Sequence, residues 1–171
     1  AAPPTGSLRW QRPQAPSVNR TSTISADAYG PQCQQVGFNG QPSLQSGGAT
    51  TPTSEDCLFL NVQSPANASD LPVLVWIHGG GYGAGNGRQD FTELLTTTGN
   101  NFVVVSIQYR LGPFGFLASD EVVRKGVANA GLLDQFFALQ WVQTYIEQFG
   151  GNTSAVTISG ESAGGGSVML Q

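Results

Sequence analysis

A serine flanked by glycines lies between a strand-like stretch and a helix-like stretch near the end of the 171-residue sequence. Residues 156–166 read V-T-I-S-G-E-S-A-G-G-G, so apolar residues lead into a tight turn and small residues follow it. Gly160 and Gly164 suit a sharp turn, because a side chain at either position would collide with the adjoining strand or helix. The pattern predicts a strand–turn–helix unit that presents the Ser162 hydroxyl as a nucleophile. A glycine-rich turn with an incidental serine is the alternative.

A second glycine cluster follows an early apolar run. Residues 71–77 (L-P-V-L-V-W-I) have the length and β-branched content of a strand buried on both faces, and H-G-G-G-Y follows at 78–82. Glycines let backbone N–H groups approach a substrate carbonyl, where fixed donors stabilise the negative charge that develops in acyl transfer. The pattern predicts an oxyanion hole made by this loop and by the amide after the serine, that of Ala163.

Blocks along nearly the whole chain resemble the type-B carboxylesterase and lipase family, which includes the cholinesterases. The blocks are P-P-T-G-S-L-R-W at 3–10, S-E-D-C-L-F-L-N-V at 54–62, the 78–82 block, Y-R-L-G-P-F-G-F-L at 109–117, N-A-G-L-L-D-Q at 129–135, F-G-G-N at 149–152 and the serine turn. The resemblance implies the α/β-hydrolase fold, an α/β architecture with a mostly parallel central sheet and helices on both faces. It also implies that Ser162 is the nucleophile and that Gly80, Gly81 and Ala163 donate to the oxyanion.

The hydrophobic pattern agrees with alternating strands and helices. Strands are predicted at 58–62, 71–77, 102–107 and 155–159. A helix is predicted from a cap at Asn129 to about Phe149, where Gly150 and Gly151 end it. One apolar stripe consists of Leu132, Phe136, Leu139, Val142, Ile146 and Phe149. Further apolar residues widen this stripe, so much of the helix is predicted to be buried; they are Leu133, Phe137, Trp141 and Tyr145.

The first 57 residues differ from the rest, being rich in Pro, Gly, Ser, Gln and Thr. They predict irregular loops wrapped on the core, with disorder as the alternative. Because members of the resembling family are longer, we expect residues 1–171 to form the N-terminal part of a single α/β-hydrolase catalytic domain. Its loop-rich segment is 1–57, and its sheet and helix core is 58–171.

Charge and composition exclude several classes of function. The net charge of −4 at pH 7 argues against nucleic-acid binding, which requires basic patches. No apolar run reaches the roughly 18 residues of a membrane span. One histidine and two cysteines offer no convincing zinc site. The resemblance implies a reaction on a small-molecule ester that requires neither metal nor organic cofactor.

Cys33 and Cys57 are the only two cysteines. Two buried free thiols are one interpretation, but the resemblance favours a disulfide, since the family closes a loop before the E-D-C-L block in this way. A disulfide implies an oxidising compartment. Sequons at Asn19, Asn67 and Asn152 are compatible with it. We therefore expect a secreted glycoprotein.

The only histidine, His78, has to be considered as the general base. In α/β-hydrolases the acid and the histidine follow the serine in sequence, so His78 is predicted instead to hold the glycine loop by hydrogen bonds. Residues 163–171 contain no His, Asp or Glu. A serine without a base is a poor nucleophile, so further C-terminal polypeptide is expected to complete the triad, unless the sequence is partial.

Other charged residues have expected roles near the turn and in the core. Glu161 could stabilise an imidazolium during acylation, or fix the turn by a hydrogen bond, and both roles remain open. The pairs Arg9–Glu55 and Arg110–Asp134 resemble two internal ion pairs of the family and are expected to be structural.

The segment between the cysteines bears on the substrate. In the lipases of the family this loop is a long apolar lid, and in the cholinesterases it carries a tryptophan that holds a quaternary ammonium. Here it contains no tryptophan and few apolar residues, namely Val36, Phe38, Leu44 and Ala49. The sequence favours a serine carboxylic-ester hydrolase of soluble esters. A lipase and a catalytically silent adhesion protein on the same scaffold are the alternatives.

Overall fold

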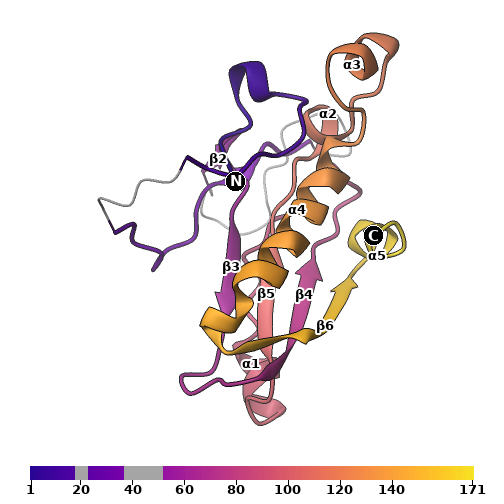
Figure 1. Cartoon of the computed structure of the whole chain (residues 1–171). Coiled ribbons are helices and arrows are strands. Elements are labelled where there is room, and N and C mark those ends of the chain that lie inside the picture. Colours follow the sequence, from indigo (N-terminus) through magenta and orange to yellow (C-terminus); the bar gives the residue numbers. More distant parts are fainter. Residues whose placement is uncertain (18–22, 37–51) are drawn as a thin grey trace.

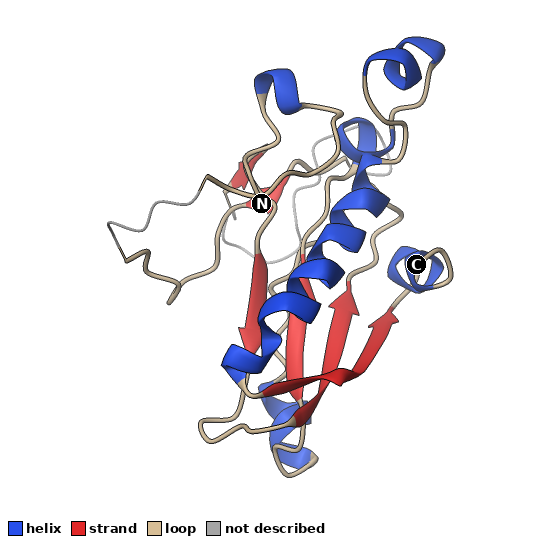
Figure 2. Cartoon of the chain, viewed as in Figure 1, coloured by secondary structure: helices blue, strands red, loops and turns tan. Residues whose placement is uncertain are grey.

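A four-stranded sheet forms the centre of the computed structural model, which describes residues 1–17, 23–36 and 52–171 (Figures 1 and 2). The strand order is β3–β5–β4–β6. The bounds are Leu60–Gln63 for β3, Leu71–Ile77 for β4, Val103–Ile107 for β5 and Gly151–Gly160 for β6. β4 runs parallel to β5 and β6, whereas β3 is antiparallel to β5. The predicted mostly parallel sheet is confirmed.

The predicted strand boundaries differ from the observed ones where a neighbouring strand decides the pairing. β4 has the predicted bounds. β6 begins four residues earlier than predicted, because Gly151 pairs with Leu71 before a register shift restores the regular ladder. β3 begins at Leu60, two residues later than predicted and three residues after the buried Cys57. These adjustments leave the element order unchanged.

Helices cover both faces of the sheet, as expected for the α/β-hydrolase fold. Helix α4 (Ala130–Tyr145) crosses one face in Figure 1, and its residue Val142 is buried there with Ile146, which directly follows the helix, and Val105 of β5. On the other face, residues just before and within α1 (Thr92–Thr97) pack against Val104. Successive strand residues point to opposite faces, so neighbouring valines of β5 serve separate cores.

The prediction that much of this helix is buried holds for only part of its apolar stripe. Val142 and Ile146 are fully buried, but Phe136 is 51% exposed and Phe149 is 41% exposed. The buried positions of this helix are Ala130, Gly131, Asp134, Gln135 and Val142. Small and polar residues occupy the buried face of α4, because the backbone of the helix lies close to the backbone near Arg110 there. A Cβ on Gly131 would lie 2.6 Å from the carbonyl oxygen of Arg110.

The end of this helical segment agrees with the prediction. A 3₁₀ turn, η2 (Ile146–Phe149), follows α4, and Gly150 then takes the left-handed conformation with φ 78°. Asn129 occupies the N-cap position, but its side chain makes no capping hydrogen bond. Glycine is favoured at position 150 because a residue without a Cβ adopts the left-handed conformation without a steric clash.

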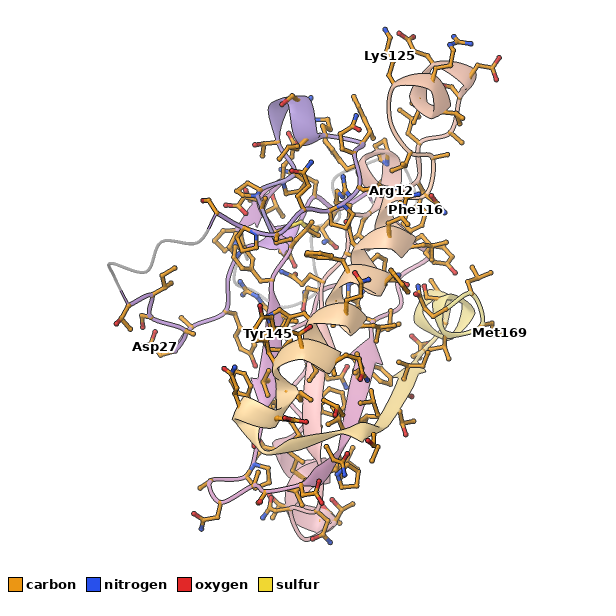
Figure 3. All side chains as sticks on the ribbon, in the orientation of Figure 1. Arg12, Asp27, Phe116, Lys125, Tyr145 and Met169 are labelled. Atoms are coloured by element: carbon orange, nitrogen blue, oxygen red, sulfur yellow. A yellow bond between two sulfur atoms is a disulfide. The ribbon has the colours of Figure 1, made fainter. Side chains whose placement is uncertain are left out.

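Three short helices were not predicted from the sequence: α1, α2 (Gly112–Phe116) and α3 (Asp120–Lys125). Each has five or six residues, too few to show a helical period. Figure 3 shows the Phe116 side chain of α2 near the upper end of α4 and Lys125 on the projecting helix α3. No helix in the described ranges is long and apolar enough to cross a membrane.

The described parts of the first 57 residues are mostly irregular, as predicted. They contain the 3₁₀ turn η1 (Gly6–Leu8) and two short strands, β1 (Gln32–Cys33) and β2 (Thr53–Ser54), that pair in parallel. A buried disulfide joins Cys33 to Cys57, so the predicted bridge is confirmed.

Two ion pairs are present, one within this N-terminal part of the chain and one within the core. Arg9 donates from Nε and Nη2 to the two carboxylate oxygens of Glu55, each at 2.6 Å. Arg110 and Asp134 form the second pair, in which Nη2 and Oδ1 lie 2.7 Å apart. Both predicted pairs are present. The second is buried and the first is partly exposed, a difference that governs their contributions to stability.

Candidate active site

The turn that carries Ser162 joins β6 to the short helix α5 (Ala163–Val168). Ser162 has φ 54° and ψ −119° and is exposed. A non-glycine residue is strained in this left-handed region, so the surrounding structure has to hold it there. Two backbone hydrogen bonds do so: Gly164 donates to the Glu161 carbonyl at 2.8 Å, and Gly166 donates to the Ser162 carbonyl at 3.0 Å. The predicted strand–turn–helix unit is present.

The glycines on either side of the serine allow α5 to lie directly on the end of β4. A side chain on Gly164 would collide with the carbonyl oxygen of Ile77, and one on Gly160 would collide with the backbone of Gly164. Ile77 and Gly160 are register partners in the parallel pair β4–β6. Because both strands end at the same edge, the segments that follow them are brought together.

The glycine loop after β4 touches the serine turn. A Cβ on Gly79 would lie 2.6 Å from the Glu161 carbonyl oxygen and 3.0 Å from Ser162 Cβ. Gly80 and Gly81 have φ values of 108° and 61°, which glycine adopts without strain. Within the described part of the chain, no hydrogen bond uses the amides of Gly80, Gly81 or Ala163. As far as the described residues go, these amides are therefore available to donate to a bound ligand.

His78 is buried beneath this loop. Its Nδ1 lies 2.9 Å from the Gly79 carbonyl oxygen, so Nδ1 carries the proton and donates it. Burial lowers the pKa of His78 from its ordinary value of 6.5 to about 4. The imidazole is therefore neutral near pH 7, and its contacts agree with the predicted role in holding the glycine loop.

Tyr109 is a supporting residue that the sequence analysis did not single out. Its ring stacks on His78 with centroids 4.5 Å apart, and its hydroxyl donates to the His78 carbonyl oxygen at 2.8 Å. Burial raises the pKa of the Tyr109 phenol, so the hydroxyl remains a donor. The sequence signal that could have identified Tyr109 is its position at the start of the Y-R-L-G block, two residues after the end of β5.

Glu161 is exposed beside the serine. Among the described residues its carboxylate accepts no hydrogen bond, and the contacts that hold the turn are made by the backbone. The suggestion that its side chain fixes the turn by a hydrogen bond therefore finds no support in these contacts. Its other suggested role, beside an imidazolium, stays a prediction.

A mostly apolar cavity of about 450 Å³ borders the glycine loop. Gly80 and Gly81 form one side, and apolar side chains line the rest, including Val36, Tyr82, Phe116 and Leu117. An apolar acyl or alcohol group is the chemistry that suits such a lining. Three of the apolar residues noted in the cysteine-closed segment, Phe38, Leu44 and Ala49, lie outside the described residues.

The sequons lie away from this edge or outside the described ranges. Asn67 is exposed in the turn before β4. Asn152 is half-buried near the start of β6, and its side-chain oxygen accepts a hydrogen bond from the Ser154 amide at 2.7 Å. Asn19 lies outside the described residues. Within the described ranges, no group of three His, Cys, Asp or Glu residues could hold a metal ion.

The family model described as "Carboxylesterase family" matches residues 1–171. The chain belongs to the carboxylesterase family. It is 46% identical to "Carboxylesterase 1E" of Mus musculus over 99% of its own length and 31% of that protein. It is 43% identical to "Acetylcholinesterase" of Bungarus fasciatus over 99% of its length and 28% of that protein.

The solved structures agree with this membership. EstA of Aspergillus niger superposes with a TM-score of 0.86 at 43% identity, over 98% of this chain and 32% of that one. The expected α/β-hydrolase fold is thereby confirmed. This carboxylesterase-family chain spans about a third of the length of the relatives it matches.

Proposed function

We propose that the complete protein is a serine carboxylesterase that works through an acyl-enzyme on Ser162. The observation that carries this proposal is the contact between the serine turn and the glycine loop at one edge of the sheet. A strained, exposed serine lies there beside backbone amides that have no partner among the described residues. Membership of the carboxylesterase family supports ester hydrolysis as the reaction.

In the proposed reaction, Ser162 Oγ attacks the ester carbonyl while a general base takes the hydroxyl proton. The amides of Gly80, Gly81 and Ala163 donate to the oxygen that becomes negatively charged. The ester C–O bond then breaks, and the alcohol leaves with the proton that the base returns. Water, activated by the same base, attacks the acyl-serine, so an acid is released and Ser162 is regenerated. Each N–H donor is worth about 2.7–4 kcal/mol of barrier in enzymes of this chemistry.

The base and its orienting acid are proposed to come from polypeptide outside residues 1–171. His78 is the single histidine of the sequence, and its Nδ1–H is engaged with the Gly79 carbonyl. A buried imidazole with a pKa near 4 is a poor acceptor for the serine proton at neutral pH. We therefore regard residues 1–171 as the N-terminal part of one catalytic domain that a C-terminal segment completes.

The decisive experiment is labelling of the complete protein with an organophosphate. We expect one adduct per molecule, located by peptide mass spectrometry on Ser162, and none in the Ser162→Ala variant. An adduct on another residue, or full ester hydrolysis by Ser162→Ala, would refute the assignment. Hydrolysis of a short aryl ester by the unmodified protein separates an enzyme from a silent adhesion protein.

A small soluble ester is the proposed substrate, with lipase activity as the alternative. The segment between the cysteines carries few apolar residues. Rates measured above and below the solubility limit of a short triglyceride distinguish the two. An esterase follows the dissolved concentration, whereas a jump in rate when droplets form would indicate a lipase.

We also propose that the protein is secreted and glycosylated. The disulfide is the supporting observation, since such bonds persist in oxidising compartments. Of the sequons, Asn67 has the most accessible side chain among the described residues. Peptide mapping after enzymatic glycan release should show Asn67 converted to Asp. An unmodified Asn67 in protein secreted by a eukaryotic host would contradict this assignment, and the same map reports on Asn19 and Asn152.

A further inference from the structure

The helix that carries the nucleophile turn is weak by its own sequence. Residues 163–168 read A-G-G-G-S-V, and glycine is the poorest helix former after proline. Packing explains why larger residues are not used. A side chain on Gly164 would collide with the Ile77 carbonyl, and a Cβ on Gly166 would lie 2.7 Å from the Tyr82 hydroxyl. Helix α5 therefore depends on tertiary contacts to keep its position.

A buried polar pair supplies one such contact. The side-chain amide nitrogen of Gln135 on α4 donates to Ser167 Oγ on α5 at 3.0 Å. Both residues have no exposed surface. Gln171 Nε2 adds a longer hydrogen bond, 3.2 Å, to Gln135 Oε1. Hydrogen bonds are directional, so this pair restricts the rotation and sliding of α5 in a way that apolar packing does not.

The helix that carries Gln135 is itself held tightly at that point. The neighbouring Asp134 accepts three hydrogen bonds from Arg110: from the backbone amide at 3.0 Å, and from Nε and Nη2 at 2.7 Å each. Arg110 lies three residues after the end of β5, so its contacts with Asp134 fix the position of Gln135 relative to the central sheet. Hydrogen bonds from Arg110 to Asp134 and from Gln135 to Ser167, joined by the backbone of α4, thus link the segment after β5 to α5.

We propose that Gln135 and Ser167 are positioning residues, which hold Ser162 and the Ala163 amide in register with the glycine loop. Ser167 acts through α5: the preceding Gly166 amide donates to the Ser162 carbonyl at 3.0 Å. Loss of the pair allows α5 to shift against β4, and the serine moves relative to Gly80 and Gly81. The inference rests on the proposed function of Ser162.

The test compares Gln135→Leu, Ser167→Ala and the double variant in the complete protein. Gln108→Leu is the matched control, because Gln108 is also a buried glutamine, but its amide nitrogen donates to the Pro31 and Cys57 carbonyls, away from α5. Active sites are counted by stoichiometric phosphonate titration, so that kcat is calculated per functional site and misfolded molecules are excluded from the enzyme concentration. Hydrogen exchange of residues 163–168 is measured in parallel.

We expect kcat per titrated site to fall about 10- to 100-fold in Gln135→Leu and Ser167→Ala with little change in KM, the scale of a small misplacement of reacting groups. The double variant should be no slower than the slower single variant, because both remove the same interaction. Exchange in α5 should accelerate in all three variants. Gln108→Leu should lose thermal stability while keeping its kcat per site and its exchange in α5.

Two different failures can be told apart. If the unmodified protein neither hydrolyses an ester nor reacts with the phosphonate, the proposed function of Ser162 fails. If it does both, and Ser167→Ala retains full kcat per titrated site with unaltered exchange in α5, the pair is only structural and the positioning role is refuted. Ser167→Ala is the milder change, so it decides the question if Gln135→Leu does not fold.

Discussion

Gly79 lies where any side chain would press on the nucleophile turn. A Cβ there would come within 2.6 Å of the Glu161 carbonyl and 3.0 Å of Ser162 Cβ, so Gly79→Ala has to displace the serine or the loop. We expect kcat/KM for an aryl ester to fall about 100-fold, since a misplacement of about 1 Å costs that much in other enzymes. Steady-state kinetics on the complete protein, normalised by active-site titration, checks this.

Gly99→Ala is the control for this prediction. Gly99 has φ 77°, and an added Cβ would lie 3.3 Å from the Asn101 side chain, in the turn that follows α1. This change should cost about 1 kcal/mol of stability with no effect on kcat/KM. Unaltered catalysis in Gly79→Ala would show that the serine turn tolerates movement and that the contact does not constrain it.

His78 should make stability depend on pH. Burial lowers the pKa of His78 to about 4 in the folded chain, against 6.5 for an ordinary histidine. Between these values the unfolded state binds more protons at this position than the folded state does. The free energy of unfolding should therefore fall by up to about 3 kcal/mol as the pH drops from 6.5 to 4.

Urea unfolding at several pH values, compared between the unmodified protein and His78→Asn, isolates this contribution. The variant lacks the titrating group, so its stability should change less over the same pH window. Identical pH dependence in the two proteins would show that His78 keeps an ordinary pKa.

At the scale of elements, two ion pairs of similar geometry should differ in energy because their burial differs. The side chains of Arg110 and Asp134 are 3% and 1% exposed, whereas those of Arg9 and Glu55 are 36% and 22% exposed. Asp134→Asn leaves a buried guanidinium without its counter-charge and should cost about 3–5 kcal/mol. Glu55→Gln should cost at most about 1 kcal/mol.

Chemical denaturation of both variants gives the comparison, and raised salt refines it. Screening should weaken the exposed Arg9–Glu55 pair and leave the buried pair nearly unaffected. Equal costs for the two variants would mean that the link between the sheet and α4 does not depend on the Arg110–Asp134 bridge.

At the scale of the whole molecule, catalysis should titrate with a histidine outside residues 1–171. His78 is neutral down to about pH 4 and cannot produce a loss of activity near pH 6 to 7. We expect kcat/KM of the complete protein to fall on the acid side with an apparent pKa close to that of an ordinary histidine, about 6.5. This apparent pKa should persist in His78→Asn, even where the disturbed glycine loop lowers the rate.

The pH profiles of the two proteins provide the check. An acid limb that disappears or moves strongly in His78→Asn would make His78 part of the proton-transfer system. The proposal that a C-terminal segment supplies the base would then have to be abandoned.

Local signals in the sequence were sufficient for several features. The bounds of β4, the turn around Ser162 and the helix end at Gly150 were all predicted correctly. Each depends on residues adjacent in the chain: a continuous apolar run, or a glycine where the backbone has to be left-handed or closely approached. The disulfide and both ion pairs were predicted from the resemblance to a known family, whose matching blocks contain Cys57 and the four charged residues of the pairs.

Tertiary packing was responsible for the features that the sequence did not predict. The buried face of α4 contains Gly131 and Gln135 while Phe136 is exposed, because α2 and α5 pack against that face. The spacing of apolar residues in the sequence does not indicate these packing partners. The contact of Gly79 with Ser162 arises because β4 and β6 are parallel neighbours that end at one edge. Pairing between strands far apart in the chain places the predicted nucleophile beside the predicted oxyanion loop. The local sequence around either segment does not determine this long-range pairing.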